Sequence, residues 1–174
     1  MTANQSAPAG ADFVISRVFD APRALVWQAF TEPERMKDWW GPKGFSVISW
    51  NMDFRPGGTY LYGMRAPDGS AMWGKFIYRE IVAPARMVFI NSFSDEAGGV
   101  TRHPMSPTWP LETLSTFTFD KQPDGKTKLT IRWSPSNATD EERKTFDSSH
   151  DGMRQGWGGT MDRLADYLAK ARQG

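Results

Sequence analysis

The sequence predicts an α+β fold, in which a curved antiparallel sheet of about seven strands packs against one long C-terminal helix. From residue 45 to residue 133, apolar and polar residues alternate and short turns interrupt the pattern, which is typical of antiparallel strands. From Thr139 to Ala171, apolar residues recur instead at helical spacing, on one side of an amphipathic helix. Because the sheet and the helix each have one apolar face, each is expected to cover the other.

The N-terminal part is expected to hold a tail, an edge strand and two short helices. Residues 1–11 are small and polar without periodicity, so we expect a disordered tail, followed by a single domain at residues 12–174. Phe13–Phe19 should form a strand that closes one edge of the sheet. One short helix should open at 20–23, and a second at 31–34, where Thr31 and Glu34 have the spacing of a capping box.

Six further strands should form an antiparallel meander, because their connections are short. We expect them at residues 45–54, 60–64, 72–82, 87–93, 112–120 and 128–133. The connection at 94–111 is unusually long for a structureless segment. We interpret it as a lid over a cavity or, with equal support, as a surface insertion.

The C-terminal helix combines a well-marked start with an unusual interior. Thr139 and Glu142 have the spacing of a capping box. Gly152, Gly156 and Gly159 form a bare stripe beside the apolar one, although each interior glycine costs roughly 1 kcal/mol relative to alanine. Either the missing side chains leave room for a cavity, or they let the helix approach the sheet closely.

Composition narrows the function classes. The 21 basic residues balance the 20 acidic ones, which gives no charge bias toward nucleic acid or an anionic membrane. Cysteine is absent, which excludes disulfides and thiolate catalysis, and two histidines do not favour a zinc site. The chain shows neither a signal-peptide pattern nor about 18 consecutive apolar residues. We therefore expect a cytoplasmic monomer or homodimer without a cofactor, metal or membrane insertion.

Five stretches of the chain are distinctive in content and order: FDAPRALVW at 19–27, WWGPKGF at 39–45, DFRPGG at 53–58, YREIVAPARMVF at 78–89 and GWGGTMDRLADYL at 156–168. They resemble the family named after the activator of heat shock protein 90 ATPase, a branch of the START and pollen-allergen (SRPBCC) superfamily. The resemblance spans nearly all of residues 12–170 and implies the helix-grip fold, in which a curved sheet wraps around the long C-terminal helix. It implies no single activity, since the superfamily includes lipid carriers, cyclases, resistance proteins and co-chaperone domains. Single-domain bacterial relatives are the closer match, because residues 1–11 are too short to be the domain that precedes this one in the namesake co-chaperone.

No catalytic motif stands out, so the polar candidates are isolated residues. The chain contains no G-x-S-x-G, P-loop or H-E-x-x-H pattern. His150 lies on the apolar stripe of the helix, as either a hydrogen-bonded core histidine or a ligand-facing acid, base or donor. His103 lies in the long loop. Asp53 and Arg55 alternate at a strand end, where a structural ion pair is favoured over catalysis.

The eight tryptophans, eleven phenylalanines and nine methionines indicate either a bulky core or a cavity lined by rigid rings. We predict reversible binding or sequestration of a hydrophobic, aromatic small molecule in an internal cavity. The expected ligand-binding residues are Trp39, Trp40, Tyr62, Met64, Trp73, Phe76, Phe89, Phe93, His103, Trp109, Phe117, Trp133, His150, Met153 and Trp157.

Two alternatives stay open. A cofactor-independent enzyme of the cyclase or hydrolase type could use the same cavity, with a histidine or Asp53 as acid or base. A co-chaperone-like interaction module would instead show a large exposed apolar patch and no significant cavity.

Overall fold

The computed structural model describes residues 12–173, and the predicted disordered tail at residues 1–11 lies outside the described residues. The elements are β2 (Phe13–Phe19), α1 (Arg23–Thr31), α2 (Pro33–Met36), β3 (Ser46–Met52), β4 (Thr59–Arg65), β5 (Ala71–Val82), β6 (Arg86–Ser94), β7 (Val100–Thr101), β8 (Glu112–Lys121), the 3-10 turn η1 (Pro123–Gly125), β9 (Thr127–Ser136), α3 (Asp140–Ser148) and α4 (His150–Gln173).

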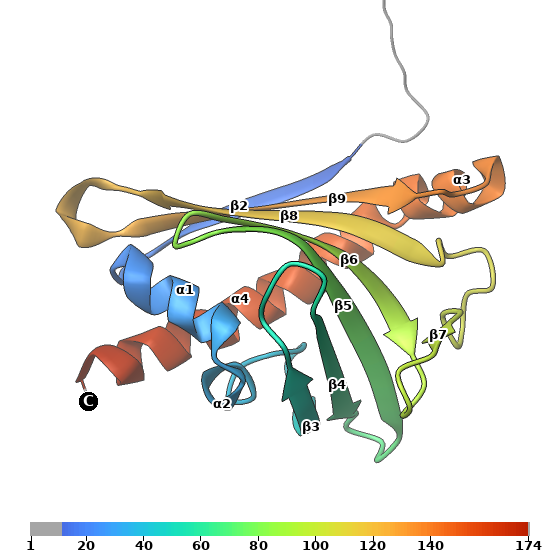
Figure 1. Ribbon diagram of the computed structural model, residues 1–174, viewed down its shortest axis with the longest axis horizontal. Coiled ribbons are helices and arrows are strands. Elements are labelled where there is room, and N and C mark those ends of the chain that lie inside the picture. Colours follow the sequence, from blue (N-terminus) through green and yellow to red (C-terminus); the bar gives the residue numbers. More distant parts are fainter. Residues whose placement is uncertain (1–11, 174) are drawn as a thin grey trace, which may run out of the picture.

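The strands form one antiparallel sheet in the order β2-β9-β8-β6-β5-β4-β3, with the short β7 paired to β6. The predicted meander and the predicted edge position of the first strand are both confirmed. The sheet bends strongly from β2 toward β3, and α4 runs along its concave side together with α1 and α2 (Figure 1). The chain therefore has the α+β helix-grip architecture.

The capping box predicted at Thr31 is wrong. Thr31 is the last residue of α1, and Glu32 is the N-cap of α2 without a side-chain cap. Pro33 stands at the first turn of α2, and a residue before proline is driven out of the helical region, so the break falls at Glu32, which is extended at φ −110° and ψ 110°.

The C-terminal segment is two helices rather than the single helix predicted. The capping box at Thr139 is confirmed, with reciprocal side-chain and backbone bonds to Glu142. The helix is interrupted at Ser149, whose side chain donates to the Thr145 carbonyl oxygen at 2.7 Å. Serine side chains compete with helical backbone bonds in this way, and a continuous apolar stripe does not reveal such a break.

Aromatic rings fill one end of the space between sheet and helices. Phe30 of α1 lies with its ring 5.5 Å from Phe117 and 5.4 Å from Phe119 of β8, in edge-on geometry. In the C-terminal part of α4, Leu164 is fully buried and Leu168 is 2% exposed. This end of the molecule is a closely packed core.

Candidate ligand-binding site

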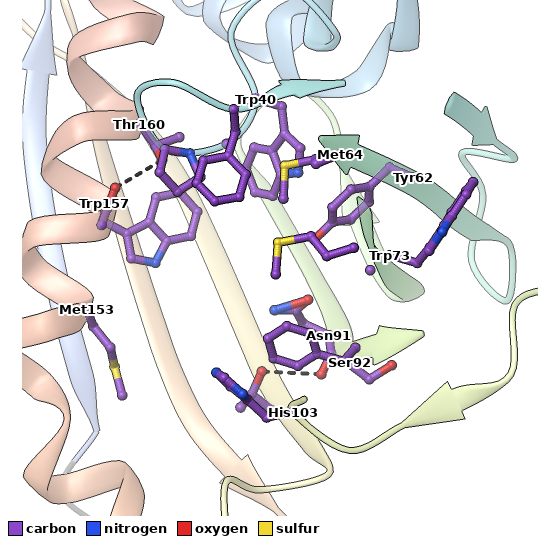
Figure 2. A pocket seen from close by; sticks show the side chains of 18 of the residues that line it. Trp40, Tyr62, Met64, Trp73, Asn91, Ser92, His103, Met153, Trp157 and Thr160 are labelled. Atoms are coloured by element: carbon purple, nitrogen blue, oxygen red, sulfur yellow. Dashed lines mark hydrogen bonds between the residues drawn. The ribbon is translucent and has the colours of Figure 1, made fainter. Parts of the chain in front are cut away.

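A cavity of about 350 Å³ lies at the other end, between the sheet and the N-terminal half of α4. Its walls come from β4, β5, β6, β8, β9, α4, the loop at 40–45 and the loop at 102–110, and they are mainly apolar. Figure 2 shows Trp157, Thr160 and Met153 projecting from α4 toward Trp40, Tyr62 and Met64 on the opposite side. The volume lies at the small end of the roughly 300–1,000 Å³ typical of small-molecule sites.

Two-thirds of the predicted ligand-binding residues border this cavity. They are Trp40, Tyr62, Met64, Trp73, Phe93, His103, Trp109, Trp133, Met153 and Trp157. They come from seven separate segments, so the fold brings them together. Whether they contact a ligand stays a prediction.

Four of the other five predicted residues, Trp39, Phe76, Phe89 and Phe117, belong to the packed core. Trp39 is 1% exposed and its indole donates to the Ala29 carbonyl oxygen. Phe76 and Phe89 stack with ring centres 4.1 Å apart, and Phe117 packs against Phe30. Their positions on the inner face were predicted, but this part of the face meets side chains of the core rather than open space.

His150, the fifth, does not border the cavity either. Its ring lies edge-on between Phe13, 5.6 Å away, and Phe146, 5.5 Å away. Its Nε2 atom is buried and has no hydrogen-bond partner among the described residues. The structure therefore supports neither the hydrogen-bonded core histidine nor the ligand-facing group.

Two glycines on β4 and β5 make room for aromatic rings. Tyr62 pairs with Gly74, and a Cβ on Gly74 would lie 2.3 Å from the Tyr62 hydroxyl oxygen. Trp73 pairs with Gly63 one residue further on, and a Cβ on Gly63 would lie 2.8 Å from the indole. Successive residues of a strand face opposite sides, so the Trp73 indole covers the outer face, and Trp73 borders the cavity without presenting its ring to it (Figure 2). The prediction that Trp73 points inward is wrong.

The structure distinguishes between the two explanations of the helix glycines. Gly156 borders the cavity, and a Cβ built on it would have no neighbour within 4 Å. The same holds for Gly152 and Gly158, while one on Gly159 would make only an ordinary contact of 3.7 Å with Lys43. The glycines therefore do not bring the helix close to the sheet, and Gly156 leaves open space in the cavity wall.

The loop at 40–45 is held in place by a cation on the helix. Arg163 Nη1 lies 3.0–3.3 Å from the carbonyl oxygens of Trp40, Gly41, Pro42 and Phe45. Burial lowers the pKa of this guanidinium from its ordinary value. One half-buried cation thus fixes the wall that carries the Trp40 indole.

A cross-strand pair provides polar groups that the sequence analysis missed. Asn91 on β6 pairs with Thr113 on β8, and Ser92 also borders the cavity. Asn91 alternates with Phe89 and Phe93, so its period-two position already indicated an inward-facing amide. The Tyr62 phenol lies on the same cavity, where burial raises its pKa to about 12 and keeps it neutral.

His103 contributes the cavity's imidazole. Its Nδ1 atom accepts a hydrogen bond from the Met105 backbone N–H at 3.0 Å, and its ring lies 4.6 Å from Phe93. Burial lowers its pKa below the ordinary 6.5. An imidazole that accepts at Nδ1 is the neutral tautomer with the proton on Nε2, so His103 is a hydrogen-bond donor at neutral pH.

The long loop at 94–111 is not structureless, because it carries β7 and a turn in which Asp95 Oδ1 accepts from the backbone N–H groups of Ala97 and Gly99. Its second half is tied to α3 by an Arg102–Glu142 ion pair and by a 2.8 Å hydrogen bond between Thr108 and Thr145. These contacts attach the cavity residues His103 and Trp109 to α3.

Charged groups lie outside the cavity. Among the residues that border it, none is Asp, Glu, Lys or Arg. Asp53 and Arg55 form an exposed ion pair at 2.9 Å, as predicted. Across residues 12–173, no cluster of three potential metal ligands and no helix suited to spanning a membrane is found.

Comparison with known proteins identifies the family. The model of the family described as activator of Hsp90 ATPase homolog 1-like protein matches residues 20–169. No curated protein matches the sequence.

Three solved structures illustrate the shared fold. A protein from Nitrosomonas europaea is 24% identical, with a TM-score of 0.74 over 94% of this chain and 97% of its own. One from Arthrobacter aurescens is 25% identical, with a TM-score of 0.71 over 91% and 86%. One from Rhodobacter sphaeroides is 19% identical, with a TM-score of 0.74 over 95% and 96%. These structures share the fold, and the match to the family model over residues 20–169 shows that the chain belongs to the activator of Hsp90 ATPase homolog 1-like family.

Proposed function

We propose that this protein reversibly binds or sequesters a hydrophobic aromatic small molecule in the cavity beneath α4. The observation that carries the proposal is the open space beside Gly156, in a cavity that Trp40, Trp133 and Trp157 also border. A helix that tolerates an interior glycine there forgoes about 1 kcal/mol, which is consistent with a space kept for a ligand.

The geometry of the rings supports an aromatic ligand. Trp157 lies edge-on to Trp40 at 5.7 Å and to Trp133 at 5.5 Å. Aromatic pairs prefer such edge-to-face or offset contacts, and a planar ligand can extend the same arrangement into the cavity.

The two alternatives have less support. An enzyme would need an acid or base at the cavity, and among the bordering residues only His103 and Tyr62 titrate, while Asp53 lies in an exposed ion pair elsewhere. The co-chaperone alternative expected no significant cavity. The family's description mentions an ATPase activator, and that activity is not carried over to this chain. A cytoplasmic location stays a prediction.

A cavity-filling variant tests the proposal. Gly156→Leu places a side chain in the open space, so binding of aromatic probes such as 2-naphthol should be lost or weakened at least about tenfold, equivalent to about 1.4 kcal/mol. Native mass spectrometry of the purified wild-type protein and titration calorimetry with the probe are the measurements.

Gly158→Leu is the matched control. A Cβ on Gly158 also has no neighbour within 4 Å, but Gly158 does not border the cavity. Both variants gain helix propensity, so both should raise the melting temperature, and only Gly156→Leu should lose the probe. If the wild-type protein neither binds the probe in calorimetry nor carries a co-purified ligand in native mass spectrometry, the proposed function is refuted.

A further inference from the structure

We propose that Asn91 and His103 make this cavity selective for uncharged aromatic molecules that carry a neutral group with both a hydrogen-bond donor and an acceptor, such as a carboxamide or lactam. The inference rests on the proposed function and adds the chemical class of the ligand.

The absence of charge from the wall excludes ions. None of the bordering residues carries a formal charge at neutral pH, because Tyr62 and His103 are both neutral there. Arg163 reaches the wall residues from α4, but its Nη1 atom is surrounded by four carbonyl oxygens. A charged ligand would lose its water without gaining a counter-ion, which is strongly unfavourable.

Asn91 provides the complementary polar group. Figure 2 shows its amide among the rings of the cavity rather than turned toward the loops. Thr113 Oγ1 donates a hydrogen bond to the backbone oxygen of Asn91 at 3.4 Å, not to its side chain. The side-chain amide of Asn91 has no hydrogen-bond partner among the described residues. A carboxamide offers two donors and one acceptor, and a polar group in apolar surroundings gains most from a partner that satisfies both kinds.

His103 adds a donor from the loop. Because Nδ1 accepts from Met105, the proton lies on Nε2. Asn91 comes from the sheet and His103 from the loop attached to α3, so the polar end of the ligand would be held between these two elements. The aromatic body of the ligand would lie toward Trp157.

Three probes of similar shape separate the contributions of hydrogen bonding, apolar contact and charge to the binding free energy. Naphthalene-2-carboxamide presents the donor and acceptor, 2-isopropylnaphthalene replaces them by methyl groups, and 2-naphthoate replaces them by a charge. Titration calorimetry at pH 7 should give the tightest binding for the carboxamide and binding at least about tenfold weaker for the naphthoate.

The variant Asn91→Leu keeps a similar volume and removes the amide. It should weaken carboxamide binding by about 2- to 10-fold, the usual value of one net hydrogen bond, and leave binding of the isopropyl probe unchanged or slightly tighter. Asn51→Leu, an exposed asparagine of β3 outside the cavity, is the matched control. Asn91→Ser serves as a second variant if the leucine disturbs folding.

The outcomes are distinct. The inference is supported if Asn91→Leu loses the preference for the carboxamide while Asn51→Leu keeps it. If the wild-type protein binds all three probes without preference, or the naphthoate best, the inference fails while the proposed function stands. If no probe binds to the wild-type protein and no ligand co-purifies with it, the proposed function fails as well as the inference.

Discussion

The two halves of α4 meet the same sheet in different ways. In the C-terminal half, Leu164 and Leu168 are at most 2% exposed and lie in a closely packed core. In the N-terminal half, Met153 and Trp157 are 8% and 7% exposed, and Gly156 stands beside open space. One helix thus combines a part that stabilises the fold with a part that leaves room. The difference lies beside the apolar stripe, where Gly156 carries no side chain, while the period of the stripe itself does not change.

The largest effect should come from removing a side chain in the packed half. Leu164→Ala should lower the free energy of unfolding by about 2–5 kcal/mol, because it creates a cavity where neighbouring side chains cannot relax fully. Met153→Ala should cost roughly half of that or less, because one side of Met153 already faces open space and makes fewer contacts there. Urea denaturation of both variants measures the ratio, and equal losses would mean that the two halves are packed alike.

Arg163 tests whether the cavity wall can be changed without disturbing the core. Arg163→Met keeps most of the side-chain stem and leaves the four carbonyl groups of the loop at 40–45 without their cation, which should cost about 1–3 kcal/mol. The loop carries Trp40, so aromatic probes should bind more weakly as well.

The control for this variant lies on the same helix. Arg154 is exposed, makes one long hydrogen bond of 3.4 Å to the Val14 carbonyl oxygen, and lies 5.4 Å from the centre of the Phe13 ring. Arg154→Met should therefore change stability by no more than about 1 kcal/mol and leave probe binding unchanged. If it matches Arg163→Met in both stability and probe binding, the carbonyl cluster does not determine the shape of the wall.

Periodicity and turn residues were sufficient to predict the architecture. Strand alternation gave the meander, and the capping box at Thr139 marked the start of the C-terminal helical segment. The break at Ser149 was not predictable, because the apolar stripe continues across it. The capping box predicted at Thr31 was wrong for a local reason, because Pro33 drives the residue before it, Glu32, out of the helical region.

The site was predictable in composition but less so in detail. Aromatic residues on inner strand positions and on α4 were identified, yet Phe76 and Phe89 stack on each other in the core while Phe93 reaches the cavity. The boundary between the packed core and the cavity depends on how several elements pack against one another. The alternation of residues along one strand carries no information about that packing. Alternation alone, however, would have shown that Trp73 faces outward and that Asn91 faces inward.

The smallest effect concerns the loop that carries His103 and Trp109. Glu142 accepts from the Thr139 backbone N–H at 3.0 Å and pairs with Arg102, and these contacts, the backbone bond first, hold its pKa below the ordinary 4.5. A carboxylate with a lowered pKa stabilises the fold above its unfolded pKa, and this contribution is lost as the pH falls through the folded value. Glu142→Gln keeps a capping side chain and loses the charge, so it should cost about 0.5–1 kcal/mol at pH 7 and progressively less below pH 4.5.

Urea denaturation of the wild-type protein and Glu142→Gln between pH 7 and pH 3 measures this convergence. A double-mutant cycle with Arg102→Met isolates the ion pair from the cap, because Arg102→Met leaves the bonds between Thr139 and Glu142 in place. Hydrogen exchange of residues 102–109 should rise in both single variants if the pair anchors the loop to α3, whereas exchange at Leu164 in the packed half should stay unchanged. A pH-independent difference between wild type and Glu142→Gln would show that the charge of Glu142 has no part in holding the loop.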